Sequence, residues 1–157
     1  MEMEIVSQIN VREAVTEDQE IIARFQIEMA WETEKVTLAP ETIQSGVQAV
    51  FENPHLGKYY VAELNGQVIA SLMITYEWSD WRSSLVWWLQ SVFVVTQYRK
   101  HGVFRKMYEH IRQLVESNKD VAGIRLYMIH HNAVAGRVYE QMGMDGNHYR
   151  LFEWMKS

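Results

Sequence analysis

The sequence contains no cysteine, and this absence excludes several classes of site. Disulfide bridges, zinc held by cysteine, iron–sulfur clusters and cysteine nucleophiles all require a thiol. Only two prolines and eight glycines occur among 157 residues, which argues against a linker-rich or fibrous chain. Single domains commonly have about 100 to 200 residues. The sequence therefore predicts one domain over residues 1–157.

Long apolar runs and an excess of basic charge are also missing. The strongest apolar stretch, 85–95, is interrupted by Gln90 and Ser91 and is too short to span a bilayer. The acidic start, residues 1–4, lacks the basic and apolar regions of a secretory signal. Fifteen Lys and Arg against twenty Asp and Glu give a net charge of −5, which disfavours general nucleic-acid binding. We therefore expect a cytoplasmic protein with neither a membrane nor nucleic acid among its partners.

The sequence does contain a large apolar share, with 48% hydrophobic residues and six tryptophans, and its first part predicts a strand and two helices. Residues 9–15 alternate in polarity as a strand does. Thr16 is a good N-cap for the next helix, with Gln19 as its capping-box partner. Pro40 opens the second helix, where a missing N–H costs nothing, and residues 53–54 (Asn-Pro) stop it.

From residue 59 the period of the pattern drops to two. The runs 59–64 and 68–76 flank residues 65–66 (Asn-Gly), the strongest short hairpin signal. The stretch 85–95 is apolar on both faces and predicts a central strand. The remaining elements are a helix after Gly102, a strand over 121–129, a helix over 133–142 ended by Gly143, and a last strand over 149–155. The order β-α-α-β-β-β-α-β-α-β predicts an α/β (α+β) fold, a single mixed central sheet with helices on both faces.

A basic segment, residues 98–106, joins the central strand to the following helix and holds four of the fifteen Lys and Arg. A helix N-terminus presents unpaired N–H groups and the positive end of the macrodipole, so phosphates bind there. Basic side chains are electrostatically unfavourable at such an end, and an anionic ligand would explain them. A solvated basic turn is the alternative. No Lys-Ser/Thr follows the glycine and no GxGxxG occurs, so Walker and dinucleotide loops do not fit.

A second pattern consists of Asn132, Ala135, Tyr139, Gly143 and Met144. Taken alone, it predicts a helix cap, a small helix and a packed tyrosine. Together with the basic segment, it resembles the GNAT superfamily, acetyltransferases that use acetyl-CoA. The family's later motif is Asn-x-x-Ala-x-x-x-Tyr-x-x-x-Gly-Phe/Met, which all five residues match. The resemblance covers roughly residues 9–155, including the order of the elements.

The family's phosphate loop, Arg/Gln-x-x-Gly-x-Gly/Ala, corresponds to residues 99–104 (Arg-Lys-His-Gly-Val-Phe). Phe104 departs from this pattern, because it stands at the last Gly/Ala position. Its side chain either crowds the pyrophosphate or turns into the core as the first apolar residue of the helix. The helical spacing of Phe104, Tyr108 and Ile111 favours the second alternative.

The resemblance implies an N-acetyltransferase that moves the acetyl group of acetyl-CoA to a primary amine of a small molecule or peptide. Attack is direct, within a ternary complex, and Tyr139 is expected to protonate the leaving thiolate. A phenol titrates near ~10 and a thiol near ~8.5, so this transfer is uphill by only about 2 kcal/mol. The implied cofactor-binding residues are Val92, Phe93, Val94, Arg99, Lys100, His101, Gly102, Val103, Phe104, Arg105, Asn132 and Tyr139.

The sequence does not identify the general base that must deprotonate the amine. Trp88 and Tyr127 stand where related enzymes often carry a carboxylate. The candidates elsewhere are Glu28, Glu32, Glu34, Glu77, His130 and His131.

Residues 31–34 (Trp-Glu-Thr-Glu) lie where the family usually builds its acceptor wall, and two carboxylates beside a tryptophan could hold an ammonium. Glu32 is accordingly the second catalytic candidate, and an ordinary solvated helix end is the alternative. The substrate-binding candidates are Trp31, Glu32, Glu34 and Glu77.

Three further expectations complete the prediction. Adjacent histidines in a strand point to opposite faces, and no third ligand accompanies His130 and His131, so we expect no metal. Phe104 and the missing strand carboxylate leave a non-catalytic acyl-CoA-binding module as an alternative function. A third possibility is a protein whose role is assembly. Its interface would be the Trp-rich hairpin, which also suits a homodimer contact, since aromatic residues are enriched at interfaces. The residues of this hairpin are Trp78, Trp81, Trp87 and Trp88.

Overall fold

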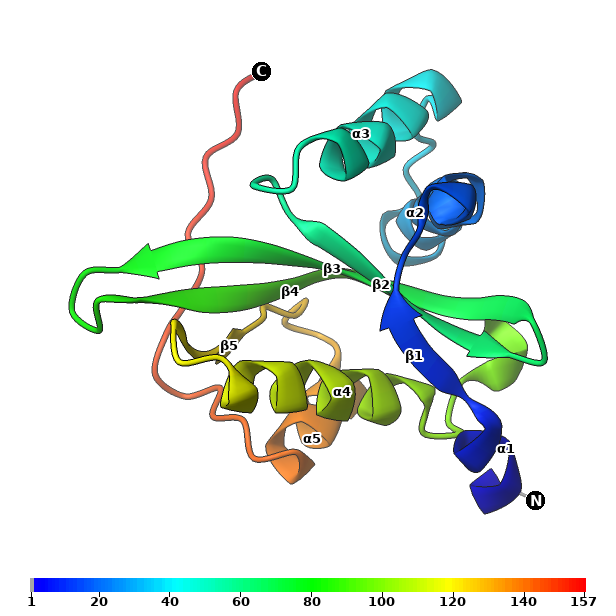
Figure 1. The fold of residues 1–157 in the computed structure, drawn as a ribbon. Helices are drawn as coiled ribbons and strands as arrows, with labels where there is room; N and C mark the ends of the chain where they lie inside the picture. The colour runs from blue at the N-terminus through cyan, green and yellow to red at the C-terminus, as the bar shows by residue number, and fades with distance from the viewer. Residues whose placement is uncertain (1) are drawn as a thin grey trace. The chain divides into compact units, whose positions relative to one another are not determined.

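The computed structural model describes residues 2–157, which divide after Arg125 into two compact units (Figure 1). The first unit holds every strand of the described chain, and the second, 126–157, holds one helix. The elements are α1 (Glu2–Gln8), β1 (Asn10–Glu13), the 3-10 turn η1 (Thr16–Asp18), α2 (Gln19–Glu34), α3 (Pro40–Glu52), β2 (Lys58–Leu64), β3 (Gln67–Ser79), β4 (Ser84–Val94), the 3-10 turn η2 (Thr96–Tyr98), α4 (Val103–Ser117), β5 (Val121–Arg125) and α5 (Ala133–Gln141).

A five-stranded sheet in the order β1-β2-β3-β4-β5 forms the centre of the first unit. The strands from β1 to β4 pair antiparallel, and β5 pairs parallel to β4. Helices α2 and α3 cover one face of the sheet and α4 covers the other (Figure 1). The predicted fold class, a mixed sheet with helices on both faces, is therefore confirmed. The prediction that the apolar stretch around 85–95 is an interior strand is confirmed too, because β4 lies between β3 and β5.

Strand β2 shows how both faces of the sheet become buried. Tyr59 and Val61 pack in a cluster with Ile22 of α2. The intervening Tyr60 belongs to the opposite face, where its ring meets His110 of α4 edge-on at 5.9 Å between centroids. Ile22 and Val61 are fully buried. Burial of a large aliphatic side chain contributes about 1.5–3 kcal/mol to the free energy of unfolding. Packing of helices on both faces therefore stabilises the sheet.

Local signals placed several boundaries correctly. Asn65 and Gly66 have φ values of 51° and 78°, as the predicted two-residue hairpin between β2 and β3 requires. Pro40 is the first residue of α3, and the helix ends directly before Asn53. Gly143 follows the last turn of α5 with φ 85°, which only glycine adopts at little cost.

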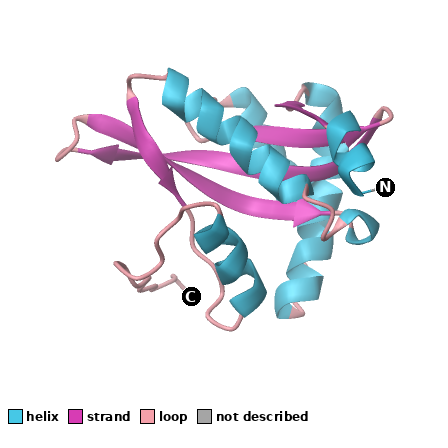
Figure 2. Ribbon diagram, turned by 90° about the horizontal axis from the view of Figure 1, so that it is seen from below, coloured by secondary structure: helices cyan, strands magenta, loops and turns pink. Residues whose placement is uncertain are grey.

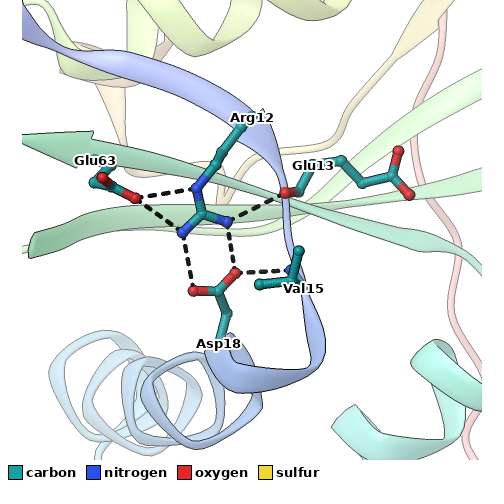
Figure 3. A network of polar contacts seen from close by, with 5 residues as sticks. All are labelled: Arg12, Glu13, Val15, Asp18 and Glu63. Carbon is teal, nitrogen blue, oxygen red and sulfur yellow. Dashed lines mark hydrogen bonds and ion pairs between the residues drawn. The ribbon is translucent and has the colours of Figure 1, made fainter. Parts of the chain in front are cut away.

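The start of α2 differs from the prediction, and Thr16 is not its N-cap. Thr16 lies inside η1, and the extended residue before this turn is Val15. The Val15 N–H donates to the carboxylate of Asp18 at 2.8 Å. Arg12 holds the same carboxylate through two hydrogen bonds (Figure 3). The charged network fixes the chain here, so the predicted pair of Thr16 and Gln19 does not form.

Two further predictions were wrong at the other end of the chain. The strand predicted over 121–129 ends at Arg125, because its pairing with β4 ends at Trp88, just before β4 becomes irregular. The strand predicted over 149–155 does not form, and residues 145–157 adopt neither helix nor strand. A strand forms only by pairing with another strand, and residues 126–157 contain no strand that could be its partner.

The N-terminal helix α1 was not anticipated by the sequence pattern. None of the helices within residues 2–157 is long and apolar enough to cross a membrane.

Candidate functional site

A β-bulge interrupts β4 near its C-terminal end. Opposite β3, Phe93 pairs with Ser71 but Gln90 pairs with Met73, so β4 contains one extra residue between these two pairs. Ser91 in this interval has φ 53°, a left-handed conformation that serine rarely adopts. Such an insertion bends the strand and re-aims the residues that follow it.

The bulge lies where β4 also loses its other neighbour. The last pair between β4 and β5 is Trp88 with Arg125. Figure 2 shows the short strand β5, which follows α4, leaving the direction of the long strand β4. Within the first unit, the edge of β4 from Leu89 to Val94 therefore has no strand partner on the β5 side. Main-chain N–H and C=O groups on this edge suit an extended ligand that carries amides, apart from the Val94 carbonyl, which accepts a hydrogen bond from Arg99.

The loop after β4 leads straight into the N-terminus of α4. Lys100 has φ 66° and Gly102 has φ 78°, and Gly102 is the N-cap. The first intrahelical bond, from the Lys106 N–H to the Gly102 carbonyl, measures 3.0 Å. The N–H groups of the first turn before Lys106 have no partner inside the helix. No acidic residue lies in that turn. An anion bound there would be attracted by the positive end of the helix and would not be repelled by a carboxylate in the turn.

The backbone conformation at position 102 favours glycine. Its φ of 78° is strained for any residue with a side chain, whereas a Cβ atom there would make only an ordinary contact, 3.4 Å from Cγ2 of Val6. Lys100 and Arg105 are exposed beside the loop, whereas the ammonium of Lys106 donates to the Val6 carbonyl at 2.5 Å. The loop thus combines backbone donors with two exposed cations, and this donor set fits phosphate groups.

Phe104 is half-buried in the first turn of α4. Its ring centroid lies 6.4 Å from that of Tyr108, one turn further along the same helix. The ring therefore packs along the side of the helix toward its second turn.

Arg99 and Glu32 meet although 67 residues separate them in the sequence. Nη2 of Arg99 donates to Oε2 of Glu32 at 2.7 Å, and both side chains are 38% exposed. Nε of Arg99 donates to the Val94 carbonyl at 2.7 Å. The sequence placed these two side chains in different roles, cofactor binding and catalysis, and the structure joins them.

The second unit carries the remaining motif. The side chain of Asn132 accepts a hydrogen bond from the Ala135 N–H at 3.1 Å and so caps α5. At the other end, the Met144 N–H donates to the Tyr139 carbonyl at 3.0 Å. The side chain of Tyr139 is half-buried, and this burial raises the pKa of its phenol. The phenol therefore stays protonated at neutral pH, as a proton donor requires.

The model of the acetyltransferase (GNAT) family matches residues 15–144, most of the chain. The chain belongs to this family. No curated protein matched the sequence, but solved structures resemble it closely. A possible acetyltransferase from Clostridium difficile 630 is 35% identical, with a TM-score of 0.88 over 96% of this chain and 99% of that one.

More distant structures share the GNAT fold. An aminoglycoside acetyltransferase from an uncultured soil metagenomic sample, solved with sisomicin, is 13% identical with a TM-score of 0.74. The alignment covers 97% of this chain and 99% of that chain. Glucosamine-6-phosphate N-acetyltransferase from Arabidopsis thaliana is 14% identical with a TM-score of 0.70, over 94% and 99% of the two chains.

In this GNAT chain, the carboxylates considered as bases differ in their surroundings. Glu77 accepts hydrogen bonds from Nε1 of Trp88, at 2.6 Å, and from Nη1 of Arg125. The hydrogen bond from Trp88 lowers the pKa of Glu77, and Arg125 lowers it further. Partial burial acts in the opposite direction but is outweighed. Glu77 is therefore ionised, and two hydrogen bonds hold its carboxylate in place. Glu28 and Glu34 are exposed.

The expected acceptor wall of the GNAT chain is not a single cluster. Glu32 and Glu34 are two residues apart on α2 and so project to different sides of the helix. The exposed ring of Trp31 already faces a cation, because Nζ of Lys35 lies 5.5 Å from its centroid. His130 and His131 are exposed in a turn of the second unit. Among residues 2–157, no group of three or more His, Asp or Glu could hold a metal ion.

The left-handed Ser91 and the Arg99 contact with Val94 escaped the sequence analysis. Neither has a local signal, since serine does not ordinarily mark a bulge and the contact depends on how β4 ends.

Proposed function

We propose that this GNAT chain transfers the acetyl group of acetyl-CoA to a primary amine of a small molecule or peptide. One observation carries the proposal: the open, bulged edge of β4 runs directly into the left-handed loop before α4. The edge suits an extended arm that carries amides, and the loop suits phosphates. Acetyl-CoA has these two chemical parts joined end to end.

Each part of the segment has a role in this proposal. The main chain of Val92, Phe93 and Val94 binds the pantetheine arm. The amides of residues 100–105 bind the pyrophosphate, and exposed Lys100 and Arg105 add positive charge. A main-chain N–H near the bulge stabilises negative charge on the thioester oxygen during attack. Asn132 contacts the pantetheine arm.

The amine loses two protons in the reaction, and the thiolate gains one. The ammonium of the acceptor first loses one proton to solvent, and its nitrogen then forms a bond to the thioester carbon and gives up the second proton as the amide forms. The carbon–sulfur bond breaks, and the CoA thiolate takes a proton from Tyr139. The Tyr139 hydroxyl is protonated at neutral pH, and burial raises its pKa, which makes it a weaker acid. The tyrosinate is reprotonated through solvent by the second proton that the nitrogen released, which closes the cycle.

Two observations support a primary amine as the acceptor. The neighbours of the same fold include enzymes named for an aminoglycoside and for glucosamine 6-phosphate, both of which carry amines. The exposed carboxylates Glu28 and Glu34 provide negative charge on α2, the helix that follows β1. A positively charged amine is attracted to such a surface.

The decisive experiment measures acetyl-CoA binding and turnover together. Acetyl-CoA at about 100 times its dissociation constant should stabilise the fold by roughly 2.7 kcal/mol, seen as a higher melting temperature. Release of free CoA is then followed with polyamines, amino acids, aminoglycosides and N-terminal peptides. Gly102→Val is the matched control, since it should remove the thermal shift without unfolding the protein.

The outcomes separate the alternatives. No thermal shift at millimolar acetyl-CoA would reject the cofactor assignment. A shift without CoA release for any amine would instead favour the non-catalytic acyl-CoA-binding module.

We also propose a homodimer contact at the tip of the β3–β4 hairpin. Trp78 and Trp81 are 62% and 92% exposed there, which is unusual for large aromatic side chains. Trp87 and Trp88 are half-buried and lie in the strand itself. Light scattering of the wild type and the Trp78→Ala/Trp81→Ala double variant tests this contact. An unchanged mass would reject it.

A further inference from the structure

The guanidinium of Arg99 makes three contacts, each with a different group. Nε donates to the Val94 carbonyl and Nη2 donates to Glu32, both at 2.7 Å. The guanidinium carbon lies 5.4 Å from the ring centroid of Phe93, within cation–π range. The side chain that opens the phosphate loop is therefore directed toward β4 and α2.

These contacts connect the two sides of the proposed site. Val94 ends β4, and Arg99 begins the loop that leads to Gly102 and α4. Glu32 lies in the last turn of α2, on the acceptor side. Beneath this pair, the Phe93 ring stacks on Phe25 of α2 at 4.9 Å between centroids.

The exposure of the pair indicates that it does little for the fold as a whole. Both side chains are 38% exposed, and ion pairs this accessible contribute little to global stability. The bond to the Val94 carbonyl is different, because it fixes the main chain exactly where the strand passes into the loop. The pair is thus better suited to setting local geometry than to holding the domain together.

We infer that Arg99 and Glu32 are a positioning pair that couples the acceptor-side helix α2 to the acetyl-CoA loop. This inference rests on the proposed function. Glu32 holds the guanidinium, the guanidinium holds the Val94 carbonyl, and the loop after Val94 is thereby placed to receive the phosphates. In this inference Glu32 acts through Arg99, whose N–H its Oε2 accepts, and not as the base.

Two other roles for these residues give different results, so the inference can be tested. The variants are Glu32→Gln, Arg99→Gln and the double variant, and Glu116→Gln is the matched control. Glu116 forms an exposed ion pair with Arg112 at 2.9 Å on α4, away from the loop. Acetyl-CoA affinity is measured by calorimetry, and the pH profile of kcat/KM is measured for each variant.

We expect Glu32→Gln to weaken acetyl-CoA binding about fivefold, although Glu32 does not touch the loop amides. Arg99→Gln should weaken it at least as much, and the double variant should equal Arg99→Gln. The shape of the pH profile should stay that of the wild type. Glu116→Gln should leave both measurements unchanged.

Three results would overturn the inference. Tighter acetyl-CoA binding in Glu32→Gln would mean that Glu32 competes with the phosphates for Arg99. A kcat loss of about 10²-fold with a vanished acidic limb and unchanged affinity would make Glu32 the base. Unchanged affinity and unchanged kinetics would leave the pair without a role.

Failure of the proposed function is recognised separately, because wild-type protein would then not bind acetyl-CoA. Hydrogen exchange on the free protein decides the inference in that case. Glu32→Gln should speed amide exchange in residues 95–102 and in the last turn of α2 together, relative to Glu116→Gln. Exchange that is unchanged in both segments would show that the pair does not couple them.

Discussion

Two arginines of this chain each bind carboxylates, and they do so in contrasting surroundings. Arg12 on β1 donates to Asp18 at 2.7 and 3.1 Å and to Glu63 at 2.9 and 3.0 Å (Figure 3). The side chain of Asp18 is only 8% exposed. Arg99 binds one carboxylate, Glu32, and both partners are 38% exposed.

These contrasting surroundings separate residues that stabilise the fold from residues placed beside the proposed site. Removal of Asp18 would leave Arg12 with only Glu63 and the Glu13 carbonyl, and the Val15 N–H without its acceptor. Arg99 instead donates one N–H to the carbonyl of Val94, where the open edge of β4 ends and the loop begins. The Arg12 network is more deeply buried, and its guanidinium is engaged by several partners. The Arg99 pair is exposed and lies next to the loop before α4.

The largest expected effect is on the Arg12 network. Asp18→Ala should reduce the free energy of unfolding by about 3 kcal/mol, because it breaks a buried ion pair and leaves the Val15 N–H without its acceptor. Acetyl-CoA affinity should stay within about twofold of the wild type. Urea denaturation and calorimetry measure the two quantities. Asp18→Asn, which keeps an acceptor oxygen, should lose less stability, and an equal loss would argue against the charge as the cause.

On the side of the site, Tyr139→Phe should produce the opposite division of effects. It keeps the packed ring and removes the hydroxyl, so kcat should fall about 10²-fold while the melting temperature changes little. Steady-state kinetics beside melting curves make the comparison. Wild-type turnover in Tyr139→Phe would remove Tyr139 from the mechanism. Tyr139→Ala would then be damaging only through the cavity it creates, at about 3–5 kcal/mol.

Acid should weaken the Arg12 network selectively. Burial raises the pKa of Asp18, but hydrogen bonds from Arg12 and from the Val15 N–H outweigh it, so the net pKa is lowered. The native state therefore binds this proton less readily than the unfolded chain does. The stabilisation from Asp18 is complete above the unfolded pKa near ~3.9 and is lost as the pH falls through the lower native value.

The measurement is a series of urea midpoints from pH 7 down to pH 2.5 for the wild type and Asp18→Asn. The wild type should be the more stable at pH 7, and its advantage should shrink below about pH 4. A constant difference across this range would contradict the assignment.

The smallest expected effect sharpens the contrast between the two arginines. Glu32→Gln should change the free energy of unfolding by less than about 1 kcal/mol, as is usual for an exposed ion pair. The same urea experiment that reports a large loss for Asp18→Ala tests this value. A loss of similar size in both variants would remove the distinction between a network for the fold and a pair for the site.

The sequence predicted those features that depend on one residue or on a short pattern. The Asn65-Gly66 turn, the start of α3 at Pro40 and the loop glycine before α4 each follow from backbone geometry that few residues tolerate. The two GNAT motifs located the loop and the Tyr139 helix for the same reason.

Features that depend on distant partners were beyond the sequence. Arg12 and Glu63 are 51 residues apart, and their network displaced the predicted cap at Thr16. The pattern over 149–155 alternates well enough for a strand, but a strand also needs a neighbour, which no local pattern supplies. The pairing of Arg99 with Glu32 likewise depends on how α2 crosses the sheet.

The extra residue in β4 also sets a limit on how this chain can change in length. Gln90 pairs with Met73 and Phe93 pairs with Ser71, and the extra residue lies between these two pairs. Deletion of Ser91 would therefore keep Phe93 opposite Ser71 and against Phe25, but it would make β4 a regular strand. The local bend would be lost, and the main chain of Val92 to Val94 would no longer be re-aimed. Insertions and deletions are therefore tolerable in the hairpin tip near Trp81, but removal of the one extra residue at the bulge would change the direction in which the chain enters the loop before α4.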